Sequence, residues 1–331
     1  MSAQPASEHS RIRRVGSSAL VLLVGTVLAL AVGEGFLRLK NSDMKNYDIE
    51  MWKYSRELKT ISPNQKMAFS HKPKASAILQ SVEIRTNEWG LRGSPVPPAA
   101  DGSRRVLFLG SSILLGWGVP EQETLTAQLE KMLAARKPGV AVLNGGVGNY
   151  NAERYVERFF VELKDLRPTD IVVQYFLRDA ESLEPAEGNM LMRNSELAAT
   201  LWIAGSRLFG KIGAQSLSDY YRSIYRPDAP GFVQMQASLK RLAAYAKEHR
   251  IRLYLAMTPD VHNLQNYQFS FVHDIIRGIA EAEGYTYVDL LPAFGSLSPK
   301  EVWAMPGDPH PNALGHKLMA QALFPILEQG R

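Results

Sequence analysis

The stretch "RRVLFLGSSILLGWGVPEQETL" (Arg104–Leu125) decides the fold. A short, continuous apolar run ends at Gly110, two serines follow, and a segment with helical spacing of apolar residues begins soon afterwards. This pattern predicts a buried strand that delivers Ser111 and Ser112 to a tight turn. The turn either presents a hydroxyl for chemistry or is ordinary Gly-Ser-Ser turn chemistry, and the rest of the chain must decide between the two.

The same alternation of strand and helix continues to the C-terminus. Apolar strands are predicted at "VAVLNGG", "DIVVQYF", "RLYLAMTP" and "YTYVDLL", and each is followed by a segment with helical periodicity. Strands that are apolar throughout and separated by helices are typical of a parallel sheet covered on both faces. We therefore expect an α/β fold with three α/β/α layers and a five-stranded parallel sheet, whose reactive groups collect at the carboxyl ends of the strands.

The N-terminal region predicts a membrane segment. Residues 15–32 contain no charge over 18 residues, which is close to the ~20 residues that cross a bilayer. Three arginines just before them favour a cytoplasmic N-terminus. We expect an uncleaved transmembrane signal anchor over residues 15–38, and the alternative is a signal peptide cleaved near Ala29-Leu30-Ala31. Both place the large domain outside the cytoplasm.

The pattern divides the chain into four parts. We expect a cytoplasmic tail (1–14), the anchor (15–38), a polar linker with a small cap (39–103), and one large domain (104–331). Within the cap, "SVEIRTNEWGLRG" predicts a strand and a turn. An apolar insertion at about 181–230 interrupts the large domain, and it could be a lid, a membrane-touching helix, a partner surface or an ordinary packing helix.

Composition excludes several classes of function. The 331 residues carry a net charge of +5 with Lys and Arg scattered along the chain, so no nucleic-acid partner is expected. The chain has no cysteine, which excludes disulfides, thiolate metal sites and a cysteine nucleophile. We expect no cofactor and no metal, because Asp308 and His310 have no third ligand nearby in the sequence.

A serine hydroxyl becomes a useful nucleophile only when a base takes its proton. Two histidines follow predicted strands in Asp-x-His arrangements, Asp308–His310 after the fifth strand and Asp260–His262 after the fourth. We predict Ser112 as the nucleophile, His310 as the base and then the acid, and Asp308 as the group that orients the imidazole. The Asp260–His262 pair is the reserve candidate.

Four motifs carry a resemblance to a known family. "LFLGSSILLGWGV", "VLNGGVGNYN", "IVVQYFLRDAE" and "DPHPNALGH" resemble, in order, the four blocks of the SGNH/GDSL hydrolases. Upstream, "RTNEWGLRG" resembles the Asn-x-x-Gly-Leu-Arg element that precedes this domain in membrane-anchored members. The resemblance implies a flavodoxin-like arrangement of the sheet and acyl transfer through Ser112. The Asp-x-His spacing is similar to that of the polysaccharide acetyltransferases.

The resemblance also implies an oxyanion hole, in which this chain departs from the family pattern. The implied donors are the Ser112 N–H, a backbone N–H at Gly148 or Asn149, and the third-block side chain, where Arg178 replaces the family's Asn. Asn tolerates a left-handed backbone, so Asn149 could still present its N–H. Arg178 offers five donors and could stabilise an oxyanion directly.

Two further consequences of these departures remain open. Arg178 could instead pair with Asp179 or Asp308 and block the site. The family's Asp before the nucleophile is Ser111 here, and because that Asp mainly shapes the turn, its loss does not by itself abolish activity.

The combined prediction is an exported, membrane-anchored serine esterase of a bacterial inner membrane, with its catalytic domain in the periplasm or outside the cell. Its implied substrates are O-acyl esters, above all O-acetyl esters, of an envelope or exported polysaccharide, cleaved through an acyl-Ser112 intermediate. One alternative is a polysaccharide O-acetyltransferase with a multi-pass membrane partner. Two others are a catalytically degenerate glycan-binding or scaffold module and a lipase that acts on bilayer lipid.

Overall fold

The computed structural model describes residues 6–98, 103–183, 194–210, 216–305 and 310–329. The chain divides into two compact units. The first contains residues 1–52 and 188–213, and the second contains residues 53–187 and 214–331. Each unit is described by itself below.

The second unit is built on one parallel sheet, which confirms the predicted fold class. Its strand order is β6-β5-β7-β8-β9, and the strands are β5 (Arg105–Gly110), β6 (Ala141–Gly146), β7 (Asp170–Phe176), β8 (Arg252–Thr258) and β9 (Thr286–Asp289). All five lie where continuous apolar runs predicted them. This order reverses direction beside β5, and in such sheets ligands bind at the carboxyl ends of the strands next to the reversal.

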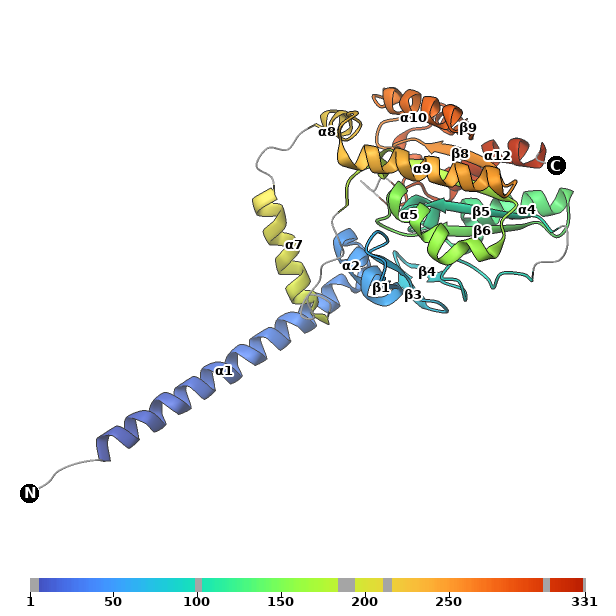
Figure 1. The fold of residues 1–331 in the computed structure, drawn as a ribbon. Helices are drawn as coiled ribbons and strands as arrows, with labels where there is room; N and C mark the ends of the chain where they lie inside the picture. The colour runs from blue at the N-terminus through green and yellow to red at the C-terminus, as the bar shows by residue number, and fades with distance from the viewer. Residues whose placement is uncertain (1–5, 99–102, 184–193, 211–215, 306–309, 330–331) are drawn as a thin grey trace, which may run out of the picture. The chain divides into compact units, whose positions relative to one another are not determined.

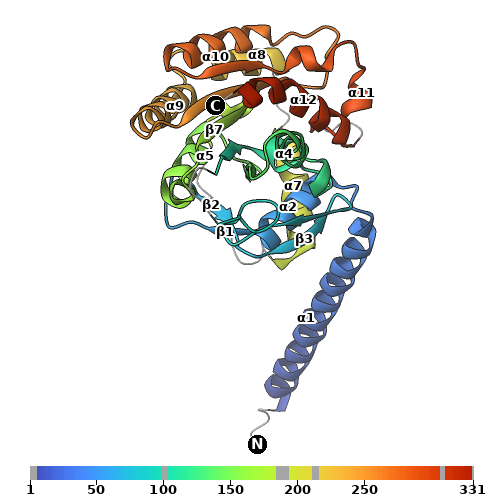
Figure 2. The same ribbon diagram turned by 90° about the vertical axis from the view of Figure 1, so that its right-hand side faces the viewer.

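Helices cover both faces of this sheet. α5 packs against α9 and α4 against α12, on opposite sides of the strands (Figures 1 and 2). The main helices are α4 (Leu125–Arg136), α5 (Ala152–Arg158), α8 (Leu217–Ile224), α9 (Pro230–Glu248), α10 (Ser270–Ala282) and α12 (Ala313–Gln329). The helix that the sequence predicts after β6 is less regular than expected. Here α5 continues as a π turn (Phe159–Leu163) and then as a 3-10 turn (Lys164–Leu166).

A buried ion-pair cluster fixes the amino ends of three central strands. Asp170, at the start of β7, binds the guanidinium of Arg104 just before β5 (2.8 Å) and that of Arg252 at the start of β8 (2.8 Å). Thr169 adds a hydroxyl hydrogen bond to the same carboxylate. Burial opposes ionisation, but these hydrogen bonds outweigh it and lower the pKa of Asp170. The cluster therefore sets the alignment of the strands at the edge opposite their carboxyl ends.

The cap holds more regular structure than the sequence predicted. Helix α2 (Tyr47–Leu58) leads into two antiparallel hairpins, β1 (Lys59–Ile61) with β2 (Phe69–His71) and β3 (Ser76–Leu79) with β4 (Val82–Arg85). The predicted strand and turn correspond to β4 and the turn that follows it. In that turn the Asn87 carboxamide oxygen accepts the N–H groups of Trp89 and Leu91, and Gly90 is left-handed (φ 66°).

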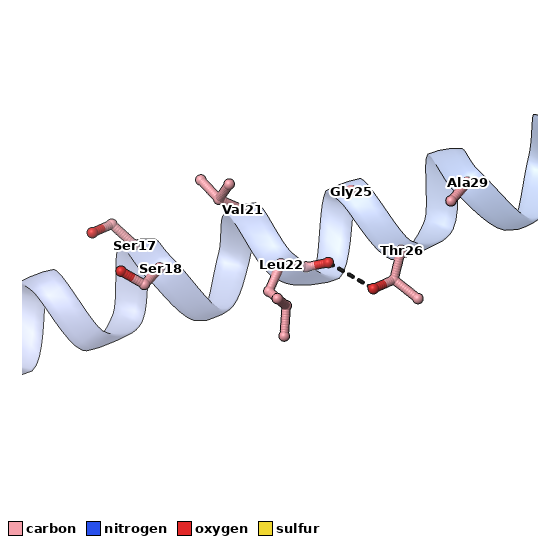
Figure 3. Close-up of a pocket in the computed structure, with 7 residues that line it drawn as sticks. All are labelled: Ser17, Ser18, Val21, Leu22, Gly25, Thr26 and Ala29. Atoms are coloured by element: carbon pink, nitrogen blue, oxygen red, sulfur yellow. Dashed lines mark hydrogen bonds between the residues drawn. The ribbon is translucent and has the colours of Figure 1, made fainter.

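The first unit contains the apolar helix α1 (Ala6–Lys40). Among the described residues, the segment Val15–Asp43 is long and apolar enough to cross a membrane, a property that an N-terminal signal sequence shares. One side of this helix carries Ser17, Ser18, Gly25 and Ala29 (Figure 3). The Thr26 hydroxyl on the same side is satisfied by the Leu22 carbonyl (2.8 Å), so it adds no unpaired polar group to the apolar segment.

Helix α7 (Glu196–Gly210) is the described helix of the insertion that lies in the first unit, and it packs against α1. The Glu34 carboxylate caps its first turn by accepting the Ser195 hydroxyl and the N–H groups of Glu196 and Leu197, at 2.9–3.0 Å. The structure therefore shows a packing helix, and its partner within the first unit is the apolar helix α1. Parts of the insertion at 184–193 and 211–215 lie outside the described residues.

Candidate active site

The opening turn has the geometry that the sequence predicted. β5 ends at Gly110, Ser111 is extended, and the short helix α3 (Ser112–Leu115) begins at once. A Cβ on Gly110 would lie 2.9 Å from the Gln174 carbonyl oxygen on the neighbouring strand, so only glycine fits without a shift. Ser112 is therefore delivered to the carboxyl edge of the sheet, beside the reversal in strand order.

Ser112 meets a histidine there. His310 Nε2 lies 2.7 Å from Ser112 Oγ, and His310 is only 5% exposed. The backbone at His310 and just after it is pinned to the 302–304 segment, because the Ala304 N–H donates to the His310 carbonyl (2.8 Å) and the Asn312 N–H donates to the Val302 carbonyl (2.7 Å). The distance and the fixed backbone suit proton transfer from the hydroxyl to the imidazole.

The third member of the predicted triad, Asp308, lies outside the described residues. Its role in orienting the His310 imidazole therefore stays a prediction. Ser112 and His310, the predicted nucleophile and base, are 198 positions apart in the sequence and are the part of the predicted triad that the structure brings together.

The reserve pair forms, but the hydrogen bond to Ser112 comes from another histidine. His262 Nδ1 lies 2.7 Å from Asp260 Oδ1, directly after β8. The Trp303 indole N–H donates to the Val261 carbonyl between them and so holds this loop in place. The imidazole whose hydrogen bond reaches Ser112 is that of His310, and the assignment of the base follows that contact.

The second block separates the two candidate backbone donors. The Gly148 N–H donates to the Tyr54 hydroxyl (2.8 Å), so it is already engaged, which does not favour Gly148 as the predicted oxyanion donor. Asn149 is exposed and left-handed (φ 63°), as the sequence allowed. Within the described part of the chain, the N–H groups of Asn149 and Ser112 have no protein acceptor. These two groups are the donors that remain for an oxyanion.

Arg178 does not take the place of the family's Asn. Its Nε and Nη2 bind the Glu181 carboxylate at 2.9 and 3.1 Å, and its side chain is 58% exposed. It does not pair with Asp179, which is buried and accepts the Phe176 N–H (3.0 Å). The physical reason is local, because Arg178 lies on a 3-10 turn (Leu177–Ala180) and Glu181, directly after that turn, offers its carboxylate three residues later.

Sequence reasoning missed two residues that shape the site. The Arg92 guanidinium donates to the Gly116 and Val119 carbonyls, each at 2.6 Å, and so fixes the chain after α3. His316 Nδ1 accepts the Leu125 N–H (3.0 Å), and burial lowers the pKa of His316 to about 3, so it is a neutral partner at the start of α4. Arg92 lies in the motif "RTNEWGLRG" and His316 in the motif "DPHPNALGH", so these two motifs were the signal from which both residues could have been found.

No group of His, Cys, Asp or Glu among the described residues is arranged to hold a metal ion.

No family model and no curated protein matches this chain. Among solved structures, a two-domain esterase active on acetylated mannans is 15% identical with a TM-score of 0.43, over 69% of this chain and 49% of that one, so the match spans about half of that protein. An acetylxylan esterase from Geobacillus stearothermophilus is 18% identical (TM-score 0.46, 70% of this chain and 96% of that chain). A G-D-S-L family protein from Desulfitobacterium hafniense, described as lipolytic, is 14% identical (TM-score 0.41, 68% and 99%). Because these identities and TM-scores are low, the assignment of a family and an activity rests on the order of the motifs and the geometry of the site.

Proposed function

We propose that this protein is a serine esterase of the SGNH/GDSL type that works through an acyl-Ser112 intermediate. The observation that carries the proposal is the 2.7 Å contact between Ser112 Oγ and His310 Nε2 at the carboxyl edge of the sheet. The four motifs in family order, and the two unengaged N–H groups beside the serine, support the same assignment.

The residues divide the reaction as follows. His310 Nε2 takes the Ser112 proton as Oγ bonds to the ester carbonyl carbon, and the oxyanion forms facing the Ser112 and Asn149 N–H groups. The ester C–O bond then breaks, and the imidazolium returns its proton to the leaving alcohol. A water attacks the acyl-Ser112 with His310 again as the base, which releases the carboxylic acid and restores the hydroxyl. Asp308 orients the imidazole throughout.

The proposed substrates are O-acetyl esters on an envelope or exported polysaccharide. The support for the envelope location is α1. Its uncharged segment and the preceding arginines fit a single-pass anchor in a bacterial inner membrane, with the domain in the periplasm or outside the cell. Mass spectrometry of the membrane-extracted protein tests this placement. The anchor predicts the mass of the uncleaved chain in the membrane fraction, and a soluble product shortened near Ala31 would show a signal peptide instead.

Activity is tested with the full-length protein in detergent. Acetate release from p-nitrophenyl acetate, acetylated xylan and acetylated mannan is measured for the wild type and for Ser112→Ala. We expect release that disappears in the variant, and a trapped intermediate carrying one acetyl group on Ser112. A sugar acceptor added to the reaction distinguishes transfer from hydrolysis, and acetylated acceptor formed only with a multi-pass membrane partner would assign an acetyltransferase.

One observation favours a second candidate, a non-catalytic glycan-binding or scaffold module. Arg178 stands where the family has its oxyanion Asn and is directed to Glu181, so the hole has one donor fewer. Loss of one such donor lowers the rate by about 100- to 1000-fold, which slows an enzyme without abolishing its activity. A folded wild type that binds acetylated polysaccharide but releases no acetate would support the module.

A further inference from the structure

Gly148 is held by the cap through both of its flanking peptide groups. The Gly148 N–H donates to the Tyr54 hydroxyl (2.8 Å), and the Lys59 ammonium donates to the Gly148 carbonyl (2.7 Å). Both cap side chains are buried. These two long-range contacts on a single turn residue add to the backbone bond of the turn itself, which runs from the Tyr150 N–H to the Val147 carbonyl (3.3 Å).

The lysine contact determines where the next N–H points. A trans peptide is planar, with its C=O and N–H directed to opposite sides, and none of the described peptide bonds is cis. Because the Gly148 carbonyl faces Lys59, the Asn149 N–H faces away from Lys59. The turn itself lies at the strand edge that carries the nucleophile, since the Val147 N–H donates to the Gly110 carbonyl (3.2 Å).

The tyrosine contact is directional as well. Tyr54 Oη lies 2.6 Å from His71 Nε2, and His71 Nδ1 lies 2.9 Å from the Gly90 carbonyl oxygen. A carbonyl can only accept, so Nδ1 carries the proton and Nε2 accepts the Tyr54 hydroxyl proton. The Tyr54 oxygen is then left to accept the Gly148 N–H. Burial lowers the pKa of His71 well below its usual value, which keeps the ring neutral in this role.

Lysine is an unusual residue at a buried position that serves only packing, and Lys59 is buried. Its ammonium lies between the rings of Tyr54 (4.4 Å) and Phe69 (3.9 Å), away from water. Burial, and then the charge of Arg154, lower the pKa of Lys59. An ammonium group buried with a single carbonyl acceptor is costly, and such costs are concentrated at functional sites.

We propose that Lys59 and Tyr54 are positioning residues of the oxyanion hole, which clamp Gly148 through the peptide groups on either side of it, so that the Asn149 N–H stays aimed at the reacting carbonyl oxygen. The Asn-x-x-Gly-Leu-Arg element takes part through Gly90, which holds His71 and thereby Tyr54. The proposal rests on the proposed esterase activity. It makes the cap a part of the catalytic apparatus and not only a connection to α1.

The first test compares Lys59→Met with Lys72→Met in the full-length protein, with p-nitrophenyl acetate as the substrate. Lys72 also donates to cap carbonyls, those of Arg56 and Glu57, but does not touch Gly148. We expect Lys59→Met to lower kcat by about 10- to 100-fold with KM within about twofold, because the Asn149 N–H that Lys59 positions acts on the transition state. Lys72→Met should keep the wild-type kcat.

The second test covers the case in which Lys59→Met does not fold. Tyr54→Phe removes the acceptor for the Gly148 N–H, and Tyr285→Phe is its control, since Tyr285 donates one buried hydrogen bond to the Leu239 carbonyl (2.8 Å). Tyr54→Phe should lower kcat and spare KM, whereas Tyr285→Phe should change neither. A wild-type kcat in folded Tyr54→Phe, with Ser112→Ala inactive, overturns the clamp and leaves the esterase intact. A wild type without any activity overturns both.

Discussion

Ser112 and His310 meet because each is held by its own backbone environment. Gly110 allows β5 to pass close to the Gln174 carbonyl before the turn, and the His310 loop is pinned by two hydrogen bonds to the 302–304 segment. In the proposed mechanism a site assembled in this way is preorganised, so the hydroxyl needs no rearrangement before it attacks.

Arg178 should be dispensable for the chemistry. Its guanidinium is engaged with Glu181 at the surface, so we expect Arg178→Ala to retain kcat within about threefold, in contrast to the 100-fold or greater loss that removal of a working oxyanion donor causes. Acetate release from p-nitrophenyl acetate measures the effect. A loss of 100-fold or more in a folded variant would show that Arg178 turns toward the substrate during the reaction.

Asn149 should act through its backbone and not through its carboxamide. Its φ of 63° suits glycine at least as well, and glycine keeps the N–H. We therefore expect Asn149→Gly to retain kcat within about threefold, whereas Asn149→Val, whose branched Cβ disfavours this φ, should lower both stability and kcat. Steady-state kinetics and thermal unfolding report the two effects separately. Equal kcat in both variants would contradict a role for this N–H.

The strands could be predicted from the sequence because each is a continuous apolar run of a length that a buried parallel strand requires. The cap hairpins could not, because strands of three or four residues leave no periodicity to detect. The choice between Gly148 and Asn149 was also out of reach, since it depends on Tyr54, 94 positions away. The Arg178–Glu181 pair, by contrast, was visible as opposite charges three residues apart.

The Asp170 cluster should stabilise the sheet without affecting the chemistry. Asp170→Asn leaves the Arg104 guanidinium buried without a charged partner, and breaking a buried pair in this way costs about 3–5 kcal/mol. We expect urea unfolding to show a loss of that order, with kcat unchanged at temperatures where the variant is folded. An unchanged unfolding midpoint would show that the cluster contributes no net stability.

Two buried histidines should make the whole protein sensitive to acid. Burial lowers the pKa of His316 to about 3 and that of His71 well below its usual value. In mildly acidic solution these two imidazoles therefore bind protons in the unfolded chain but not in the folded chain. Stability is therefore lost as the pH falls below about 6.5, and for His316 the loss continues toward pH 3 at up to about 1.4 kcal/mol per pH unit.

His316→Gln isolates one of these contributions, because glutamine can still accept the Leu125 N–H but does not titrate. Burial raises the pKa of Asp179 to about 8, which gives a slope of opposite sign, so the comparison is the difference between variant and wild type. Urea unfolding between pH 6 and pH 4 should decline less steeply in the variant, by about 1.4 kcal/mol per pH unit. Parallel declines would mean that His316 is protonated in the folded protein.

Activation of Ser112 by His310 is tested by covalent labelling of the full-length protein with a fluorophosphonate probe. We expect that the wild type is labelled on Ser112, that Ser112→Ala is not labelled, and that His310→Ala loses labelling while remaining folded. Matched labelling of His262→Ala and the wild type would confirm that the reserve pair is not the base. A folded wild type that is never labelled, or a His310→Ala variant labelled at the wild-type rate, would contradict the account.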